Sequence, residues 1–376
     1  MSEYQYFEWQ TVNRLLTEAE QVAVGRLSSH IEVSASRAVV TYSWGDFRHD
    51  PRQVLARFFD AHLYMANWGS RRLMFRFPAG LLSREAIEPY CVRDRITYKT
   101  IGEFDVLDID LSEEEGGTWI EGAGSLSELV PLRNDIFQGD HRLLYLAWLK
   151  AMSIQGDEPP RDQKSTISKH MEPAVPPGIR QLSPALKRFL DQFDVSPSLV
   201  AAAAEVSPEL MEIPKADFRP LVAQLSREEC DGFLCRFAQG DTSAGMELKK
   251  CLLSLMPRKP AAQAVRRSIG ELLKRADAID NARQRRQKEE ARRKHTAEME
   301  ALAGREAETW QEVEDLVEMK QPKHYATAVQ LLAKLKELSE FRDMKADYRQ
   351  RLDLLCERYR NRHGLKLRVQ QAKLLE

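Results

Sequence analysis

The stretch between Pro260 and Gly304 constrains the fold of this chain most, because Gly270 is its only internal helix breaker. A helix of ~40 residues would be about 60 Å long at 1.5 Å per residue, which is more than a small domain can bury. The first third has apolar residues at helical spacing, whereas only alanines interrupt the polar residues from 281 to 298. The sequence therefore predicts a long helix that leaves its core and becomes exposed.

This helix is also strongly basic. Residues 258–294 contain 13 Lys and Arg against 5 Asp and Glu, a local net charge of +8. Its densest part, called the basic cluster below, consists of Arg283, Arg285, Arg286, Lys288, Arg292, Arg293 and Lys294. Such a helix is suited to phosphates or to an acidic partner, and binding to phosphates weakens steeply with salt. Because no aromatic residue lies in the cluster, nucleic-acid binding would not depend on base sequence.

An acidic segment follows directly. Residues 298–320 contain 8 Asp and Glu against 2 Lys and Arg, a local net charge of −6, and Gly304 offers a point for the chain to fold back. Two antiparallel helices of opposite charge would largely cancel the positive potential that attracts a phosphate. Each exposed ion pair between them would contribute only about 0.3 kcal/mol to stability. We expect this charge pairing, within the chain or with a partner helix, and keep nucleic-acid binding as the alternative.

Whole-chain composition sets wider limits. At 376 residues, the chain has room for two or three domains, and an apolar share of 43% argues against general disorder. The 56 Lys and Arg against 57 Asp and Glu give a net charge of −1. This total excludes a uniformly basic or uniformly acidic protein, but it does not exclude local charged patches. An acidic N-terminus, scattered cysteines and the lack of a membrane-length apolar run predict a cytoplasmic protein without a membrane partner.

Proline spacing divides the chain. Residues 154–180 are rich in proline and polar residues and are predicted to be a linker. In residues 1–153, period-two and period-3.6 patterns alternate, which indicates an α+β recognition domain. Residues 181–257 are expected to form a compact helical array, and 258–376 the long charged helix and C-terminal helical hairpins. The predicted fold class is an α+β N-terminal domain followed by an all-α region.

Several helix starts can be located. Ser183, Ser196 and Ser207 each precede a proline, which combines an N-cap hydroxyl with a residue that needs no first-turn N–H donor. Ser226 and Glu229 have the spacing of a capping box. We therefore expect helices to begin at all four serines.

An acidic patch lies in the first domain. Residues 103–128 contain 9 Asp and Glu and no Lys or Arg. Asp108 and Asp110 would share one face of a strand, where two carboxylates could hold Mg²⁺ as in metal nucleases, although a half-solvated strand shows the same alternation. The predicted acidic docking surface consists of Asp105, Asp108, Asp110, Glu113, Glu114 and Glu115.

Two further groups have competing interpretations. Trp44 and Trp68 each adjoin a glycine, with arginines such as Arg48, Arg71 and Arg72 nearby. They could form an aromatic and arginine pocket for a planar or anionic ligand, but we expect them to be core residues at strand ends. We expect His62 to be a packed histidine, because Phe58, Phe59 and Leu63 surround it in the sequence.

Five segments carry a family resemblance. Residues 4–10 (YQYFEWQ), 44–47 (WGDF), 67–69 (NWG), 200–204 (VAAAA) and 325–332 (YATAVQLL) together resemble a family of uncharacterised bacterial cytosolic proteins. The C-terminal helices also look like those of some SWIM-type zinc-finger proteins, which are thought to be interaction or nucleic-acid-associated factors. This chain lacks the Cys and His spacing of that finger, so the resemblance implies no zinc site.

The sequence contains no phosphate-binding loop, dinucleotide-binding glycine motif, HExxH motif or CxxC pair, so we predict no cofactor and no catalytic residues. Our leading prediction is a non-enzymatic adaptor or scaffold that binds protein partners through helical surfaces and charged patches. The alternative is a nucleic-acid-binding factor that uses the basic cluster. A second alternative is a metal-dependent nuclease or hydrolase around Asp108 and Asp110.

Overall fold

The computed structural model describes residues 4–113, 126–157, 170–210, 218–241, 243–255 and 267–375. The chain forms two compact units, Met1–Asp280 and Asn281–Glu376. Helix α13 (Ile269–Ala303) contributes residues to both units, and each unit is considered by itself. Part of the predicted linker lies outside the described residues, and the four sequence-based domain limits stay predictions.

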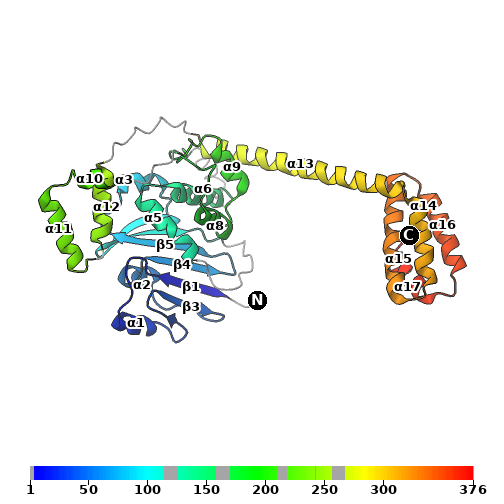
Figure 1. Cartoon of the computed structure of the whole chain (residues 1–376), viewed down its shortest axis with the longest axis horizontal. Coiled ribbons are helices and arrows are strands. Elements are labelled where there is room, and N and C mark those ends of the chain that lie inside the picture. Colours follow the sequence, from blue (N-terminus) through cyan, green and yellow to red (C-terminus); the bar gives the residue numbers. More distant parts are fainter. Residues whose placement is uncertain are drawn as a thin grey trace. The chain divides into compact units, whose positions relative to one another are not determined.

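The first unit is built on a seven-stranded antiparallel sheet with the order β2-β3-β1-β4-β5-β7-β6 (Figure 1). The strands are β1 (Gln5–Gln10), β2 (Glu32–Val33), β3 (Arg37–Tyr42), β4 (Ala61–Ala66), β5 (Arg71–Pro78), β6 (Ile96–Ile101) and β7 (Phe104–Asp110). The predicted α+β class is confirmed. Strands β4 and β6 were not predicted. Strand β4 lies in the middle of the sheet and is buried on both faces, so its sequence does not alternate between polar and apolar residues.

Short helices accompany the sheet. Those of the first unit are α1 (Glu18–Gly25), α2 (Pro51–Phe58), α3 (Arg84–Ile87), the 3-10 helix η1 (Glu88–Tyr90), α4 (Leu126–Leu129), α5 (Pro131–Phe137), α6 (Arg142–Asp157), α8 (Pro184–Gln192), α9 (Pro197–Ala204), α10 (Arg219–Val222), α11 (Arg227–Ala238) and α12 (Ala244–Ser254). Ser183 and Ser196 cap α8 and α9, and Ser226 forms the expected capping box with Glu229 at the start of α11.

The helix expected after Ser207 is absent from the described residues around it. Ser207 is buried, and its hydroxyl donates to the carbonyl oxygen of Pro176 at 2.8 Å. The same hydroxyl oxygen accepts from the backbone N–H of Ile179 at 3.1 Å. This prediction was wrong because the serine connects two distant segments instead of capping a local turn.

The two faces of the sheet are covered by different helices. On one face, Leu63, Phe75 and Leu107 belong to a core that also includes residues of α6, α8 and α9. Leu272 at the start of α13 belongs to the same core, so helices on both sides of the Pro-rich segment share it. On the other face, α2 packs its Leu55 into the core that contains strand residues of β1, β3, β5 and β7.

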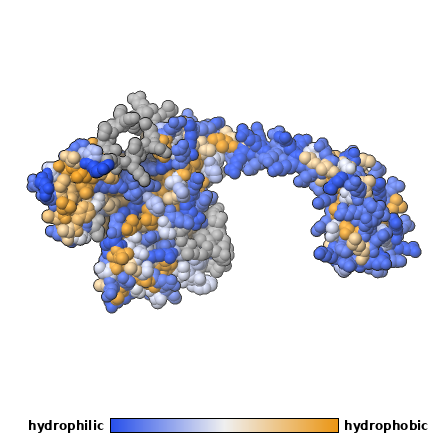
Figure 2. All heavy atoms as spheres, viewed as in Figure 1, coloured by the Kyte–Doolittle hydropathy of each residue, from blue (hydrophilic) through white to orange (hydrophobic). Residues whose placement is uncertain are grey.

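Helices α10, α11 and α12 bury little apolar surface. Helix α11 has no buried residue, and Leu234 and Phe237 are 62% and 45% exposed. Apolar residues accordingly appear over this group of helices in the space-filling view (Figure 2). In α12, Ala244 and Leu252 are buried.

The second unit contains the last part of α13 and the bundle of α14 (Glu306–Glu318), α15 (Pro322–Phe341), α16 (Lys345–Arg358) and α17 (His363–Gln371). Val313, Leu332, Leu352 and Val369 form part of its core. The long exposed helix and the helical hairpins are confirmed, and α13 ends next to Gly304 as predicted. Among the described helices, none has the length and apolar character needed to span a membrane.

Candidate binding surfaces and buried charge clusters

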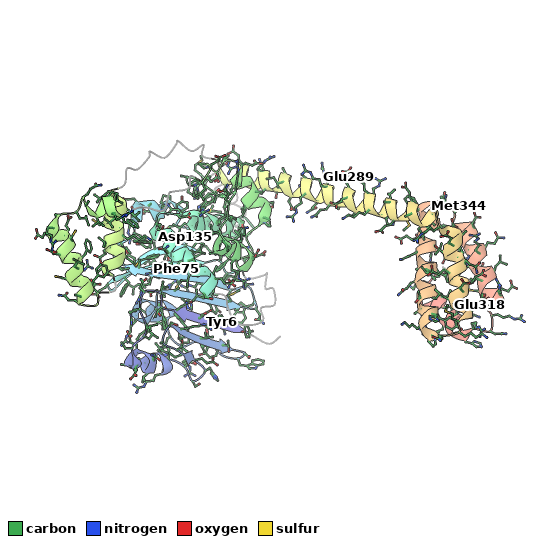
Figure 3. The ribbon with its side chains drawn as sticks, viewed as in Figure 1. Tyr6, Phe75, Asp135, Glu289, Glu318 and Met344 are labelled. Carbon is green, nitrogen blue, oxygen red and sulfur yellow. The ribbon has the colours of Figure 1, made fainter. Side chains whose placement is uncertain are left out.

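The basic cluster projects from α13 into solvent. All seven of its side chains are exposed, and the segment is hydrophilic throughout in Figure 2. The neighbouring Glu289 also points away from the helix (Figure 3). Arg285, Lys288 and Arg292 have the i, i+3, i+7 spacing that brings side chains to one face of a helix. This face therefore presents three positive charges, with the carboxylate of Glu289 among them at i+4 from Arg285.

The acidic residues of α14 do not neutralise this cluster. Within residues 267–375, its ion pairing is limited to Lys294 and Glu290, one turn apart on α13 with 2.9 Å between Nζ and Oε1. Glu306 pairs instead with Arg342 and Arg351 at 3.3 and 3.5 Å.

A second acid of α14 is also used within the bundle. Glu314 pairs with Arg358 of α16, with 2.7 Å between Oε2 and Nη1. The expected antiparallel pairing of the two charged segments is therefore not what the second unit shows: the acids of α14 stabilise the bundle, and the basic cluster stays exposed.

The bundle contacts α13 just beyond the cluster. His295 Nε2 lies 2.8 Å from Glu337 Oε1 of α15, and Met299 is buried in the bundle core. The anchored part of the helix therefore begins where the basic cluster ends.

The predicted acidic docking surface is largely directed into the protein. Asp105 is buried and accepts hydrogen bonds from the Gly80 backbone N–H at 2.9 Å, the Tyr98 hydroxyl at 2.8 Å and the Thr100 hydroxyl at 2.6 Å. Burial alone would raise the pKa of Asp105, but these donors outweigh it and the pKa is lowered.

Asp110 and Glu113 of the predicted acidic surface also contact other side chains. Asp110 is half-buried and accepts from the Ser112 hydroxyl at 2.6 Å, and Glu113 pairs with Lys150 at 2.5 Å. Glu114 and Glu115 lie outside the described residues. An exposed acidic surface is thus contradicted for Asp105 and Asp108, which are both buried.

Asp108 forms a charge cluster with two arginines on one face of the sheet. Its carboxylate accepts from Arg72 Nε and Nη2 at 2.7 and 2.6 Å, and from Arg52 Nε at 2.7 Å. Asp108 and Asp110 do share one face of β7, as the alternation predicts. Both oxygens of Asp108 are nevertheless already bonded to guanidinium groups, which a Mg²⁺ ion would have to displace. Among the described residues, no three acidic, histidine or cysteine side chains gather as a metal site would require.

His62 is a packed residue, as predicted. It is fully buried in β4 and stacks on Trp9 with 4.5 Å between ring centroids. Its Nδ1 lies 2.9 Å from the carbonyl oxygen of Glu8, which can only accept, so Nδ1 carries the proton. Burial lowers the pKa of His62 to about 3, and the ring is therefore neutral in the folded protein at pH 7.

The two tryptophans are not core residues. Trp44 is 76% exposed and Trp68 is 39% exposed, which contradicts our expectation. The arginines predicted to accompany them point into the protein instead: Arg72 binds Asp108, and Arg71 Nε donates to the carbonyl oxygen of Gln192 at 3.1 Å. The aromatic and arginine pocket is therefore not assembled from these two arginines.

A second buried charge cluster was missed by the sequence analysis. Asp60 Oδ1 lies 2.9 Å from Arg76 Nη2 and 3.8 Å from Arg133 Nη2. Its Oδ2 accepts from the backbone N–H of Val12 at 2.7 Å. The available signal was Arg76 itself, an arginine within the otherwise apolar part of β5 from Leu73 to Phe77.

Comparison of the chain with protein-family models, curated proteins and solved structures finds no match.

Proposed function

We propose that this chain binds nucleic acid through the basic cluster on α13. The observation that supports the proposal is the exposure of all seven basic side chains next to an acidic helix whose Glu306 and Glu314 pair with other arginines. A cluster in which basic side chains outnumber acidic ones attracts polyanions, because binding releases the counterions condensed on the phosphates.

The dimensions suit a nucleic-acid backbone. Residues 283–294 contain seven basic side chains against Glu289 and Glu290, a local net charge of +5. Twelve helical residues rise about 18 Å, which matches roughly five phosphates of one strand at about 3.4 Å each. Because phosphate contacts position a protein without reading bases, the binding is expected to be independent of sequence.

A charge-reversal variant tests the proposal. In the full-length chain, Arg285, Arg286, Arg292 and Arg293 are changed together to glutamate, which preserves helix propensity. Binding to a fluorescent duplex of mixed sequence at low salt should then be lost. The matched control reverses four exposed basic residues of the bundle, Lys323, Lys334, Arg349 and Arg360, and produces the same change in net charge.

The control variant should bind within a few-fold of the natural protein. Equal loss in both variants would show that only total charge matters and would contradict a site on α13. Unchanged binding in the α13 variant would remove the proposal altogether. Circular dichroism of each variant establishes that the helices are retained.

A second candidate is an adaptor that docks a protein partner on α11. The supporting observation is that this amphipathic helix buries none of its residues and leaves Leu234 and Phe237 exposed. Exposed apolar residues on one helix are typical of helix-mediated recognition. A partner that co-purifies in fixed stoichiometry should be lost when both residues are changed to serine, and retained when Val22, exposed on α1, is changed in the same way.

A further inference from the structure

A cavity in the first unit has no role in the surfaces described above. It has a volume of about 380 Å³ and lies between α5 and α12, beside the residues that follow β1. This is within the range of about 300–1,000 Å³ that small-molecule sites occupy. Its apolar wall includes Val130, Phe137 and Met246, and its polar lining includes Asn13, Arg133 and Lys249.

Arg133 is the unusual member of this lining. The residue is 3% exposed, and its Nε donates to the carbonyl oxygen of Arg76 at 2.8 Å. Its terminal nitrogens Nη1 and Nη2 lie 4.0 and 3.9 Å from the sulfur of Met246. A thioether is a weak acceptor, and the carboxylate of Asp60 lies 3.8 Å from Nη2, beyond hydrogen-bond distance, so both terminal nitrogens have weak partners.

The surrounding charges do not balance Arg133. Arg76 and Arg133 are both buried and share the single carboxylate of Asp60, which lies closer to Arg76. The Arg76 Nε is a buried donor without a hydrogen-bond partner among the described residues. Asp60, Arg76 and Arg133 together therefore carry a net charge of +1. All three are buried, where a charge without a counter-charge is costly.

Local contacts compensate this charge only in part. The guanidinium carbon of Arg133 lies 4.9 Å from the ring centroid of Phe77, a cation–π distance. Burial lowers the pKa of Arg133 to about 10, although attraction to Asp60 opposes that effect. Arg133 therefore stays protonated at pH 7, and the cluster retains its excess positive charge.

We propose that this cavity binds a small organic carboxylate. The carboxylate pairs with Nη1 and Nη2 of Arg133 in the two-pronged geometry that guanidinium groups favour. The apolar part of the ligand packs against Phe137 and Val130. Lys249, whose Nζ lies 5.7 Å from the centroid of the Phe137 ring, provides a second positive charge at this wall.

In this proposal, the Met246 side chain moves aside when the carboxylate binds. Its sulfur lies near the nitrogens that the carboxylate would bind, and it also accepts from Asn13 Nδ2 at 3.1 Å. Methionine is flexible, and replacing two weak sulfur contacts by charge-assisted hydrogen bonds favours its displacement.

Isothermal titration of the full-length chain with benzoate and its neutral analogue benzamide tests this proposal. Benzoate should bind saturably and at least about tenfold more tightly than benzamide, a difference of about 1.4 kcal/mol. The Arg133→Met variant should lose this preference. The control is Lys250→Met on α12, which removes a side chain whose Nζ donates to the Gly80 carbonyl oxygen, and this variant should bind benzoate as the natural protein does.

A second variant keeps the test decisive if Arg133→Met does not fold. Val130→Phe enlarges a side chain of the apolar cavity wall and leaves the charge cluster intact, and it should abolish benzoate binding. Equal affinity for benzoate and benzamide, no binding of benzoate at millimolar concentration, or undiminished binding in the variants that fold would overturn the proposal. The charge-reversed α13 variant should bind benzoate normally, which separates this site from nucleic-acid binding.

Discussion

Asp108 on β7 is bound in two-pronged fashion by Arg72 on β5, with 2.7 and 2.6 Å between its carboxylate oxygens and the guanidinium nitrogens. Arg52 at the start of α2 binds the same carboxylate. The cluster thereby connects two strands and the helix that covers this face of the sheet. An aspartate that looked like a surface or metal-binding group in the sequence is a structural group in the fold.

Replacing Asp108 by asparagine should destabilise the first unit by about 3 kcal/mol, because removing one partner leaves a poorly solvated guanidinium without its counter-charge. Urea unfolding followed by tryptophan fluorescence measures the change. The matched control is Asp94→Asn, which alters an ion pair whose side chains are 94% and 90% exposed and should cost less than about 0.5 kcal/mol. Equal effects of the two substitutions would contradict the structural role of Asp108.

The stability of the first unit should fall as the pH drops below 6.5 because of His62. Its pKa is about 3 in the folded protein and near 6.5 in the unfolded chain, so between these values the unfolded state binds a proton that the folded state does not. Each pH unit in this window costs up to about 1.4 kcal/mol. Urea unfolding between pH 6.5 and 4.5 measures the slope.

Variants identify the residue responsible for this slope. His62→Asn offers a donor near the position of Nδ1 and removes the titrating ring, so its stability should depend less on pH. His49→Asn changes an exposed histidine and should keep the slope of the natural protein. A slope that is the same in both variants would show that other groups cause it.

Substitutions in the second unit should separate core from surface on one helix. Leu352 is fully buried in α16 and Leu354, two residues later, is 58% exposed. Leu352→Ala is expected to destabilise the bundle by about 3 kcal/mol through lost packing and a residual cavity. Leu354→Ala should change the free energy of unfolding of the bundle by less than about 0.5 kcal/mol. Hydrogen exchange of the backbone amides in α14–α17 measures the stability of both variants. A loss of protection in Leu354→Ala as large as that in Leu352→Ala would contradict the described packing.

Local patterns predicted local structure well. The alternation in β7 correctly places Asp108 and Asp110 on one face, and the capping box at Ser226 begins α11 as expected. The break at Gly304 follows from the same kind of signal. Each of these depends on residues within a few positions of one another, where backbone geometry and hydrogen bonding act directly.

The errors concern contacts between distant residues. The acids of α14 were expected to pair with α13, but two closer arginines take that role: Arg342, directly after α15, and Arg358 of α16. Asp60 and Arg133 are far apart in sequence and meet only because the fold brings α5 near the residue that precedes β4. No spacing rule along one chain identifies such pairs, since they depend on how the elements pack.

The dependence of duplex-DNA affinity on salt measures whether the basic cluster of α13 binds phosphates. If the basic cluster neutralises about five phosphates, the logarithm of the association constant should fall with the logarithm of salt concentration with a slope of about −4.5. Reversal of Arg285, Arg286, Arg292 and Arg293 should abolish measurable binding, and reversal of four exposed basic residues of the bundle should preserve the slope. No binding by the natural protein at low salt, or the same slope in the α13 variant, would contradict the account.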